Sequence, residues 1–326
     1  MNTRKTIPRP ESKFKNTLIT GLLKGWSAMV WLLKILIPIS LLTFLIEFSG
    51  WLTKIDFLLS PLMNLMHLPP NAGLPLAVGL LTGVYGGIAS MSTLALSHTE
   101  MTIIAVFLLI SHNLIQESII QGKSGFHPVK ATISRLLASV VTVMVIYPFL
   151  PESESTVTNT TVVGASAAFG PLFLQWCNDI LFLSIKICLI IIPLLTLMEF
   201  MKNYNIIRFF TLPLTPFLRF LGLNRNVGFL WLTGAFFGLS YGGAAIVEEA
   251  KEGNISPAEL SRLQISIGIN HSLIEDPVLF IPLGIGIFWL WIPRLLAAVI
   301  MVNLYNLLRR VYPAKSPKNK HRTNEV

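Results

Sequence analysis

Long apolar stretches, separated by short polar or charged segments, follow one another along almost the whole chain. A helix needs about 20 apolar residues to cross a bilayer, and eight stretches approach or exceed that length. They cover residues 26–48, 74–96, 101–120, 136–150, 172–200, 229–247, 265–291 and 295–308. The stretches are rich in leucine and lack the alternation of apolar and polar residues that marks a strand. The pattern therefore predicts an all-α polytopic membrane protein.

Two weaker segments, residues 51–66 and 206–221, decide how often the chain crosses the membrane. Each contains charged residues and proline, so each fits either a span or an interfacial or broken helix. Without them, each half of the chain has four crossings and the halves are parallel. With them, each half has five crossings and the halves are inverted.

Loop charges favour the inverted arrangement. Starting from a cytoplasmic N-terminus, the five-plus-five topology places four basic residues on the cytoplasmic side, namely Lys123, Lys130, Lys202 and Arg208. The 152–170 loop, which has two glutamates and no Lys or Arg, is then external, as the positive-inside rule expects. We therefore predict two homologous, inverted repeats of about five membrane segments each, with broken or re-entrant helices. Re-entrant segments could mimic either count.

An internal duplication supports the two-repeat organisation. Pro38 pairs with Pro193, and residues 61–73 lie without a gap on residues 216–228, both at an offset of 155. Later motifs pair at an offset of 159. The expected parts are a basic N-terminal tail (1–25), a first repeat (26–150), an external acidic linker (151–170), a second repeat (171–310) and a basic C-terminal tail (311–326). Such duplications are typical of transporters whose site lies between the halves.

Composition agrees with a membrane location. Hydrophobic residues make up 53% of the chain and charged residues 13%, with a mean hydropathy of +0.66. The net charge of +9 lies mostly at the two ends, so we expect both termini in the cytoplasm and the protein in the bacterial cytoplasmic membrane. We interpret the first apolar run as a retained helix, not a signal peptide. Basic residues without interleaved aromatics give no reason to expect nucleic acid as a partner.

A Tyr-Gly-Gly motif lies inside an apolar stretch of each half. The two copies consist of Tyr85, Gly86 and Gly87 and of Tyr241, Gly242 and Gly243. Paired glycines permit a helix break, which at membrane depth is tolerated where the exposed backbone faces protein or a water-filled cavity. Alternatively, these glycines let helices pack closely. Both interpretations stay open from the sequence.

A histidine followed by polar or acidic residues also occurs in each half. Candidate ligands for a solute or ion are His112, Asn113 and Glu117 in the first half, and Asn270, His271, Glu275 and Asp276 in the second. Ionisable residues within a membrane usually face a cavity or a partner, and histidine titrates near neutrality. Arg135 and Arg294 are the expected counter-charges, and a purely structural charge network is the alternative. Glu248 is a further candidate, unless it belongs to a solvated helix end.

These motifs resemble the nucleoside-recognition or Gate domain family. The resemblance rests on the Tyr-Gly-Gly segments, on His-Ser-Leu-Ile-Glu-Asp at 271–276 and on His-Asn-Leu-Ile-Gln-Glu at 112–117, and covers about residues 35–302. This domain also occurs in the membrane part of ferrous iron transporter B, in concentrative nucleoside transporters and in spore-maturation membrane proteins. The resemblance implies a transporter-like protein with a nucleoside-like ligand. The chain departs from the iron transporter because it has no G-x-x-x-x-G-K-[ST] nucleotide loop.

The sequence thus predicts transport of a small polar solute, nucleoside-like by resemblance, coupled to protons or cations. One alternative is a divalent metal permease that uses His271, Glu275 and Asp276 as ligands. Another is a non-transporting membrane scaffold or regulator. We expect the acidic pair after His271 to matter more than Glu117. We expect no enzyme activity and no cofactor, with the bilayer and a small polar solute or cation as partners and homo-oligomerisation left open.

Overall fold

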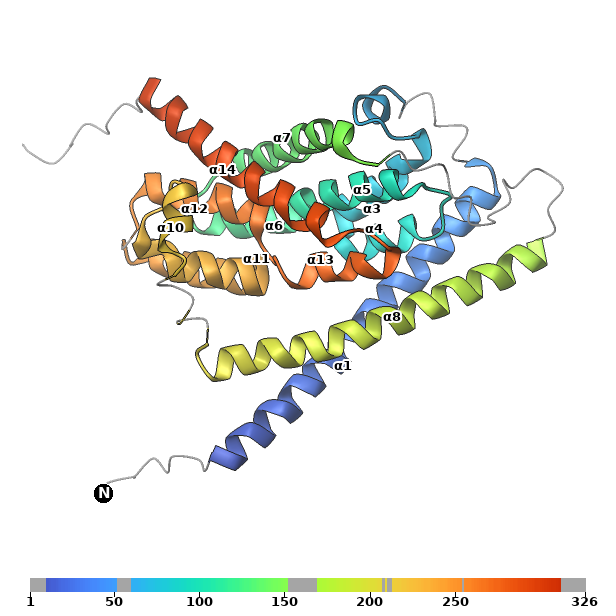
Figure 1. Cartoon of the computed structure of the whole chain (residues 1–326), viewed down its shortest axis with the longest axis horizontal. Coiled ribbons are helices and arrows are strands. Elements are labelled where there is room, and N and C mark those ends of the chain that lie inside the picture. The colour runs from blue at the N-terminus through green and yellow to red at the C-terminus, as the bar shows by residue number, and fades with distance from the viewer. Residues whose placement is uncertain are drawn as a thin grey trace, which may run out of the picture.

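The computed structural model describes residues 10–51, 60–151, 169–206, 209, 213–253 and 255–311. These residues form helices and turns, and no strand occurs among them (Figure 1). The prediction of an all-α protein is confirmed. Residues 152–168, most of the expected external linker, lie outside the described residues, so the position of that linker stays a prediction.

The helices follow the same order in the two halves of the chain. The first half contains α1 (Pro10–Phe48), η1 (Pro70–Ala72), α3 (Gly73–Thr82), α4 (Val84–Met91), α5 (His98–Ser111), α6 (Leu114–Lys123), α7 (Pro128–Ile146) and η2 (Tyr147–Phe149). The second contains α8 (Phe169–Asn203), α10 (Thr215–Phe220), η3 (Arg225–Val227), α11 (Gly228–Lys251), α12 (Pro257–Asn270), α13 (Glu275–Phe280), η4 (Ile281–Leu283) and α14 (Ile287–Val311).

Helix starts recur at the offsets found in the sequence. The starts of η1 and α3, residues 70 and 73, match those of η3 and α11 at an offset of 155. The starts of α5 and α7, residues 98 and 128, match those of α12 and α14 at an offset of 159. Local sequence explains part of this recurrence, because Ser97 and Ser256 both cap their helix by accepting from the amide three residues on.

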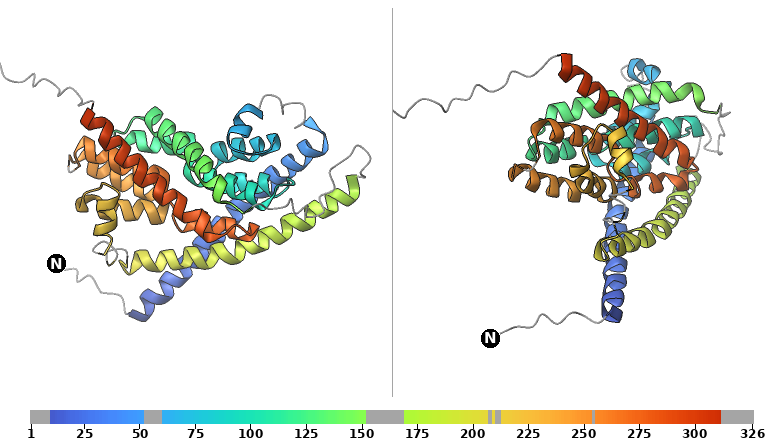
Figure 2. Two further views of the ribbon diagram at one scale, coloured as in Figure 1. Left: turned by 45° about the horizontal axis from the view of Figure 1, so that its top comes forward. Right: turned by 60° about the vertical axis from the view of Figure 1, so that its left-hand side comes forward.

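The corresponding helices α1 and α8 run antiparallel and cross along one side of the bundle (Figures 1 and 2). Trp176 Nε1 donates to Ser40 Oγ at 2.9 Å toward one end of the pair, and Lys24 contacts Glu199 toward the other. Corresponding helices that run in opposite directions are what inverted repeats produce. The orientation of the two halves relative to a membrane stays a prediction.

Two glycines in α1 allow the close crossing. A Cβ on Gly21 would lie 2.8 Å from Thr196 Cα, and one on Gly25 would lie 2.9 Å from Ile192 Cα. Glycines four residues apart are a common device for close helix approach in membranes. Since this contact lies within residues 10–25, the expected N-terminal tail of 1–25 is wrong at its boundary. The helix begins at Pro10, because its glycine and apolar positions pack on α8.

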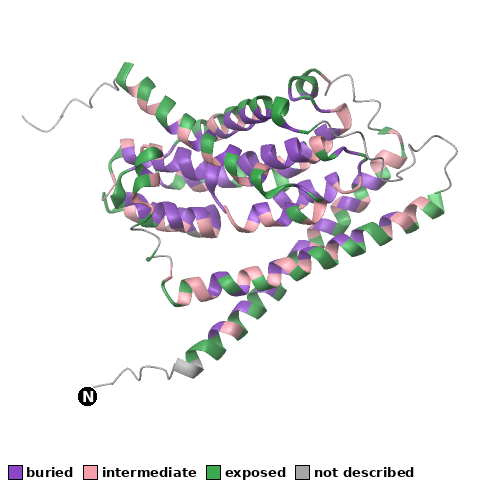
Figure 3. Ribbon diagram, in the orientation of Figure 1, coloured by how far each residue is buried: buried purple, intermediate pink, exposed green. Residues whose placement is uncertain are grey.

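Five helices in the described part of the chain are long and apolar enough to cross a membrane. They are Lys13–Phe48, His98–Lys123, Pro128–Phe149, Phe169–Asn203 and Ile287–Val311. Many of their apolar side chains are exposed. Figure 3 marks exposed residues along α1 and α8 in green. Lipid-facing side chains of a polytopic membrane protein have this property. The chain is therefore an all-α polytopic membrane protein.

The expected span at residues 74–96 is not one helix but two, α3 and α4, separated at Gly83. Gly83 has φ 96° and ψ −177°, and Gly238 inside α11 has φ 72° and ψ 178°. Non-glycine residues essentially never adopt this backbone conformation. The predicted helix breaks exist, but they fall three to five residues before the glycines expected to form them.

The Tyr-Gly-Gly glycines are packing residues. Gly86, Gly87, Gly242 and Gly243 lie inside helices and are buried. A Cβ on Gly87 would approach Gly79 Cα, and a Cβ on Gly242 would approach Gly234 Cα and N. Gly87 therefore corresponds to Gly242 at an offset of 155, one residue away from the pairing expected from the motif. Of the two interpretations that the sequence leaves open, the structure supports close packing and not a helix break at these glycines, because they lie within helices and against close neighbours.

Candidate functional site

Two further helix breaks, one in each half, place the histidines. The chain leaves α5 at His112 and restarts as α6 after Asn113, and it leaves α12 at His271 and restarts as α13 after Ser272. Asn113 and Ser272 both have φ 47°. Their amides donate to the carbonyls of the other broken helices, Gly79 O at 3.0 Å and Gly234 O at 3.3 Å. In each half, a backbone hydrogen bond thus joins the break next to the histidine to the other broken helix.

The two histidines meet where the halves join. His112 Nε2 lies 3.2 Å from His271 Nε2, and both side chains are buried. Nδ1 of His112 lies 2.8 Å from Leu108 O, and Nδ1 of His271 lies 3.1 Å from Ile267 O. A carbonyl only accepts, so each Nδ1 must donate, and a neutral ring then presents a bare Nε2 lone pair to the centre.

One carboxylate from each half completes the cluster. Glu117 Oε1 lies 3.5 Å from His112 Nε2 and 3.2 Å from His271 Nε2. Asp276 Oδ2 lies 3.4 Å from His112 Nε2 and has no hydrogen-bond partner among the described residues. Both carboxylates stand five residues after their histidine. Because the residue directly after each histidine has a left-handed backbone, the side chain five residues after the histidine faces the imidazole, and the one four residues after it does not.

Two fully buried arginines hold the backbone beneath the histidines. Arg135 donates from Nε to Ile110 O and from Nη2 to His112 O, at 2.9 and 2.7 Å. Arg294 makes the matching bonds to Ile269 O and His271 O, at 3.2 and 2.8 Å. The planar guanidinium suits this two-point grip on carbonyls that the helix ends leave free.

The arginines differ in their carboxylate contacts. Arg135 Nη2 forms a 2.7 Å ion pair with Glu117 Oε2. The contact does not have the geometry of a hydrogen bond. Arg294 has no carboxylate within ion-pair distance in the described part of the chain. Arg135 thus pairs with a carboxylate of the cluster, while its role as a counter-charge in function stays a prediction. Arg294 instead serves the backbone, because both its bonds go to carbonyl oxygens.

The centre of this cluster contains more acceptors than donors. Nε2 of both histidines and Oε1 of Glu117 lie within 4.8 Å of one another. With both histidines neutral, each Nε2 is an acceptor, and nothing donates between these three atoms. Buried acceptors without donors are costly, so a proton or a metal cation among them would stabilise the arrangement.

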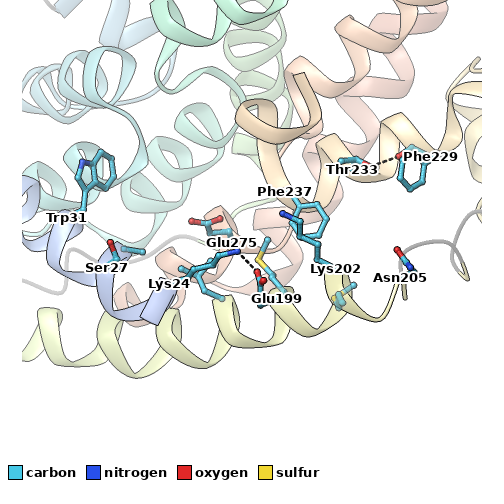
Figure 4. Close-up of a pocket in the computed structure, with 14 residues that line it drawn as sticks. Lys24, Ser27, Trp31, Glu199, Lys202, Asn205, Phe229, Thr233, Phe237 and Glu275 are labelled. Carbon is cyan, nitrogen blue, oxygen red and sulfur yellow. Dashed lines mark hydrogen bonds and ion pairs between the residues drawn. The ribbon is translucent and has the colours of Figure 1, made fainter. Parts of the chain in front are cut away.

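A cavity of about 650 Å³ lies beside the cluster, between α1, α8, α11 and α13 (Figure 4). Its wall combines aromatic, apolar and charged side chains, including Lys24, Trp31, Glu199, Asn205, Thr233, Phe237 and Glu275. Lys24 and Glu199 form an ion pair at 2.5 Å across the α1–α8 crossing. The cavity thus offers flat aromatic surfaces and both signs of charge.

Glu275 connects the cavity to the cluster. Glu275 lines the cavity and accepts from Tyr85 Oη at 3.0 Å, which joins α13 of the second half to α4 of the first. Its chain neighbour is Asp276, which faces His112. Trp31 packs edge-on against Tyr85, with ring centroids 5.6 Å apart. A residue of the cavity wall is therefore followed directly along the chain by a residue of the cluster.

The remaining predicted site residues take other positions. The Asn113 side chain bonds Gln116 and does not reach the cluster. Asn270 is fully buried, and neither of its side-chain polar atoms has a hydrogen-bond partner among the described residues. Glu248 is exposed on α11, apart from the cluster, as expected of a solvated helix end. The side chain of Tyr241 lies outside the described residues.

Several residues at the site were not anticipated from the sequence. Lys24 comes just before the apolar stretch 26–48, and Glu199 lies near the end of the stretch 172–200. Intramembrane ionisable residues are a general pointer to a pathway, so that signal was available. The mutual bond between Gln121 and Gln264, at 2.9 Å, was also missed. It joins α6 to α12 across the two halves and has no counterpart motif that would reveal it.

Comparison with known proteins gives one relative of similar length. The chain is 29% identical over 291 residues to the uncharacterized membrane protein YvoD of Bacillus subtilis (strain 168), which covers 88% of this chain and 93% of that protein. No family model matches the sequence, and no solved structure matches it. The likeness supports a membrane protein and carries no information on a substrate.

Proposed function

We propose that this protein is a secondary transporter that moves a small polar solute across the bacterial cytoplasmic membrane. The observation that carries the proposal is the position of Glu275. It lines a cavity between the crossed helices and the broken helices, binds Tyr85 of the other half, and adjoins Asp276 in the buried cluster. Broken helices beside a site shared by two related halves are the usual construction of secondary transporters.

The cavity suits a solute with a flat apolar face and hydroxyl groups, which is the chemistry of a nucleoside. Its volume of about 650 Å³ falls within the range of small-molecule sites. Trp31 and Phe237 offer aromatic faces for a base, while Glu275 and Asn205 can accept from ribose hydroxyls. This match, together with the resemblance of the motifs to the nucleoside-recognition family, supports a nucleoside-like solute.

The cluster supplies a place where a cation can be coupled to the solute. The three acceptors around His112 Nε2 lie 3.2 to 3.5 Å away and come from both halves. A proton or cation held there stabilises the contact between the halves and lies next to Glu275. Relative motion of the halves would then depend on whether the cation site and the solute site are filled.

Uptake by proteoliposomes tests this proposal. Purified protein is reconstituted, a panel of labelled nucleosides is offered under an imposed proton gradient, and initial uptake rates are compared. Glu275→Gln should lower uptake about tenfold or more, because a hydrogen bond to a charged group contributes about 1.5–3 kcal/mol. Glu248→Gln is the matched control, since it removes an exposed carboxylate from α11.

Wild-type uptake that exceeds empty vesicles and falls only in Glu275→Gln supports the proposal. Equal uptake by the Glu275 and Glu248 variants would remove Glu275 from the pathway. A wild type that takes up no solute in the panel would favour the scaffold or regulator alternative.

A further inference from the structure

We propose that His112, His271 and Glu117 form a three-residue binding site for a divalent transition-metal ion of the Zn²⁺ class at the junction of the two halves. The inference stands on the geometry of the cluster and does not depend on transport. It assigns one metal ion to a site with two ligands from the first half and one from the second.

Ligand spacing is the first support. The Nε2 atoms lie 3.2 Å apart, and Glu117 Oε1 lies 3.5 and 3.2 Å from them. A point equidistant from three atoms at these separations is about 2 Å from each, which is the bond length of zinc to imidazole nitrogen and carboxylate oxygen. Asp276 Oδ2 lies 3.4 Å from His112 Nε2 and has no hydrogen-bond partner among the described residues, but it does not belong to the group of three atoms within 4.8 Å of one another. The fourth position of a tetrahedral ion would therefore be open to water.

The groups behind the ligands are the second support. Each histidine donates Nδ1–H to a carbonyl of its own helix, Leu108 O or Ile267 O, and this fixes the ring with Nε2 toward the centre. Arg135 binds Oε2 of Glu117 and leaves Oε1 directed at the histidines. Metal-bound histidines almost always have such a partner on the second nitrogen, and ligating carboxylates are likewise held.

Charge and ligand type narrow the ion. When Glu117, Glu275 and Asp276 are all ionised, their three negative charges outnumber the two positive charges of Arg135 and Arg294, and a cation then improves the local balance. Two imidazoles favour Zn²⁺, Co²⁺ or Fe²⁺ over Mg²⁺ and Ca²⁺, which prefer all-oxygen sites, and over Cu⁺, which prefers sulfur.

Cobalt binding tests the site directly. The full-length protein, purified in detergent with a tag that lacks histidine and stripped with chelator, is titrated with Co²⁺ while its visible absorption is recorded. One equivalent should bind with the intense bands of four-coordinate Co²⁺, and added Zn²⁺ should displace it. His271→Gln and Glu117→Gln should each weaken binding by about 100-fold or more, beyond the losses typical of second-shell changes.

His67→Gln and His98→Gln are the matched controls, since both remove exposed histidines outside the cluster. Binding that survives in the controls and is lost in the cluster variants supports the site. Binding that is equal in all variants, or a wild type that binds neither Co²⁺ nor Zn²⁺, overturns it and leaves protons as the occupants of the cluster. X-ray absorption of the Zn²⁺-loaded wild type gives an independent answer if the variants do not fold, because it must show nitrogen and oxygen ligands at about 2 Å.

Discussion

At the scale of residues, the two arginines beneath the histidines have the same backbone role and different electrostatic roles. Both grip two carbonyls at the end of a broken helix, but Arg135 also pairs with Glu117. A buried pair that loses one partner leaves an uncompensated charge, and this costs about 3–5 kcal/mol. The loss of hydrogen bonds to buried carbonyls alone costs about 1–3 kcal/mol.

Arg135→Met should therefore lower the thermal unfolding temperature more than Arg294→Met. In detergent solution, the double variant Arg135→Met with Glu117→Gln should recover part of the loss, since no unpaired carboxylate remains. Equal losses for the two single variants, or a double variant less stable than Arg135→Met, would contradict the ion-pair role of Arg135.

The sequence identified most residues of the cluster, but it did not show which carboxylate makes the most contacts there. Charge and polarity inside apolar stretches pointed to both histidines and the acidic residues near them, and charge at the edges of such stretches pointed to both arginines. The larger number of carboxylates after His271 favoured Glu275 and Asp276 over Glu117. In the structure, Glu117 contacts both histidines and Arg135, while Glu275 faces the cavity. These contacts depend on the left-handed turns at Asn113 and Ser272, which a helical reading of the spacing does not include.

At the scale of elements, Gly83 and Gly238 set the paths of the broken helices. Their backbone conformation is open almost only to glycine, and other residues there incur about 1–3 kcal/mol of strain. Each break leaves carbonyls that receive the amides following His112 and His271. The positions of the histidines therefore depend on these two glycines.

Gly83→Ala and Gly238→Ala should each reduce the free energy of unfolding by about 1–3 kcal/mol. Gly286→Ala is the control, because its φ is not positive and an added Cβ would meet Trp289 at an ordinary contact distance of 3.7 Å. Thermal unfolding in detergent measures the differences. A Gly286 variant that loses as much as the other two would show that the breaks carry no special strain.

Sequence periodicity located most elements well because long apolar runs mark helices. It could not place the helix breaks, since glycine pairs serve close packing as readily as interruption. The Tyr-Gly-Gly glycines pack, whereas the isolated Gly83 and Gly238 interrupt. Only the contacts with neighbouring helices separate these two uses.

At the scale of the whole molecule, the recurring order of helices and the antiparallel crossing of α1 and α8 accord with two halves of opposite orientation. Loop charges predict the direction relative to the membrane, with basic residues on the cytoplasmic side. The sequence predicts this arrangement because the duplication and the charges of the loops can both be identified in it. The contact between His112 and His271, which joins the halves, could not be predicted from the sequence.

Cysteine labelling in intact cells tests this topology, in a background where Cys177 and Cys188 are replaced. Cysteines at Pro151 and Thr158 should react with a membrane-impermeant reagent, and cysteines at the exposed Lys123 and Lys202 should react only after permeabilisation. Thr158 lies outside the described residues, and its external position rests on the loop charges. A cysteine at Thr158 that reacts only after permeabilisation would contradict the inverted arrangement.

The central claim is that a solute passes through the cavity beside Glu275. The most direct measurement is modification of Thr233→Cys, within the cavity wall, in the same cysteine-free background and with Leu304→Cys on the exposed face of α14 as control. A bulky thiol reagent at position 233 should stop nucleoside uptake by proteoliposomes, and the transported nucleoside should slow the reaction, with neither effect at position 304. Full modification at position 233 with unchanged uptake would contradict the claim.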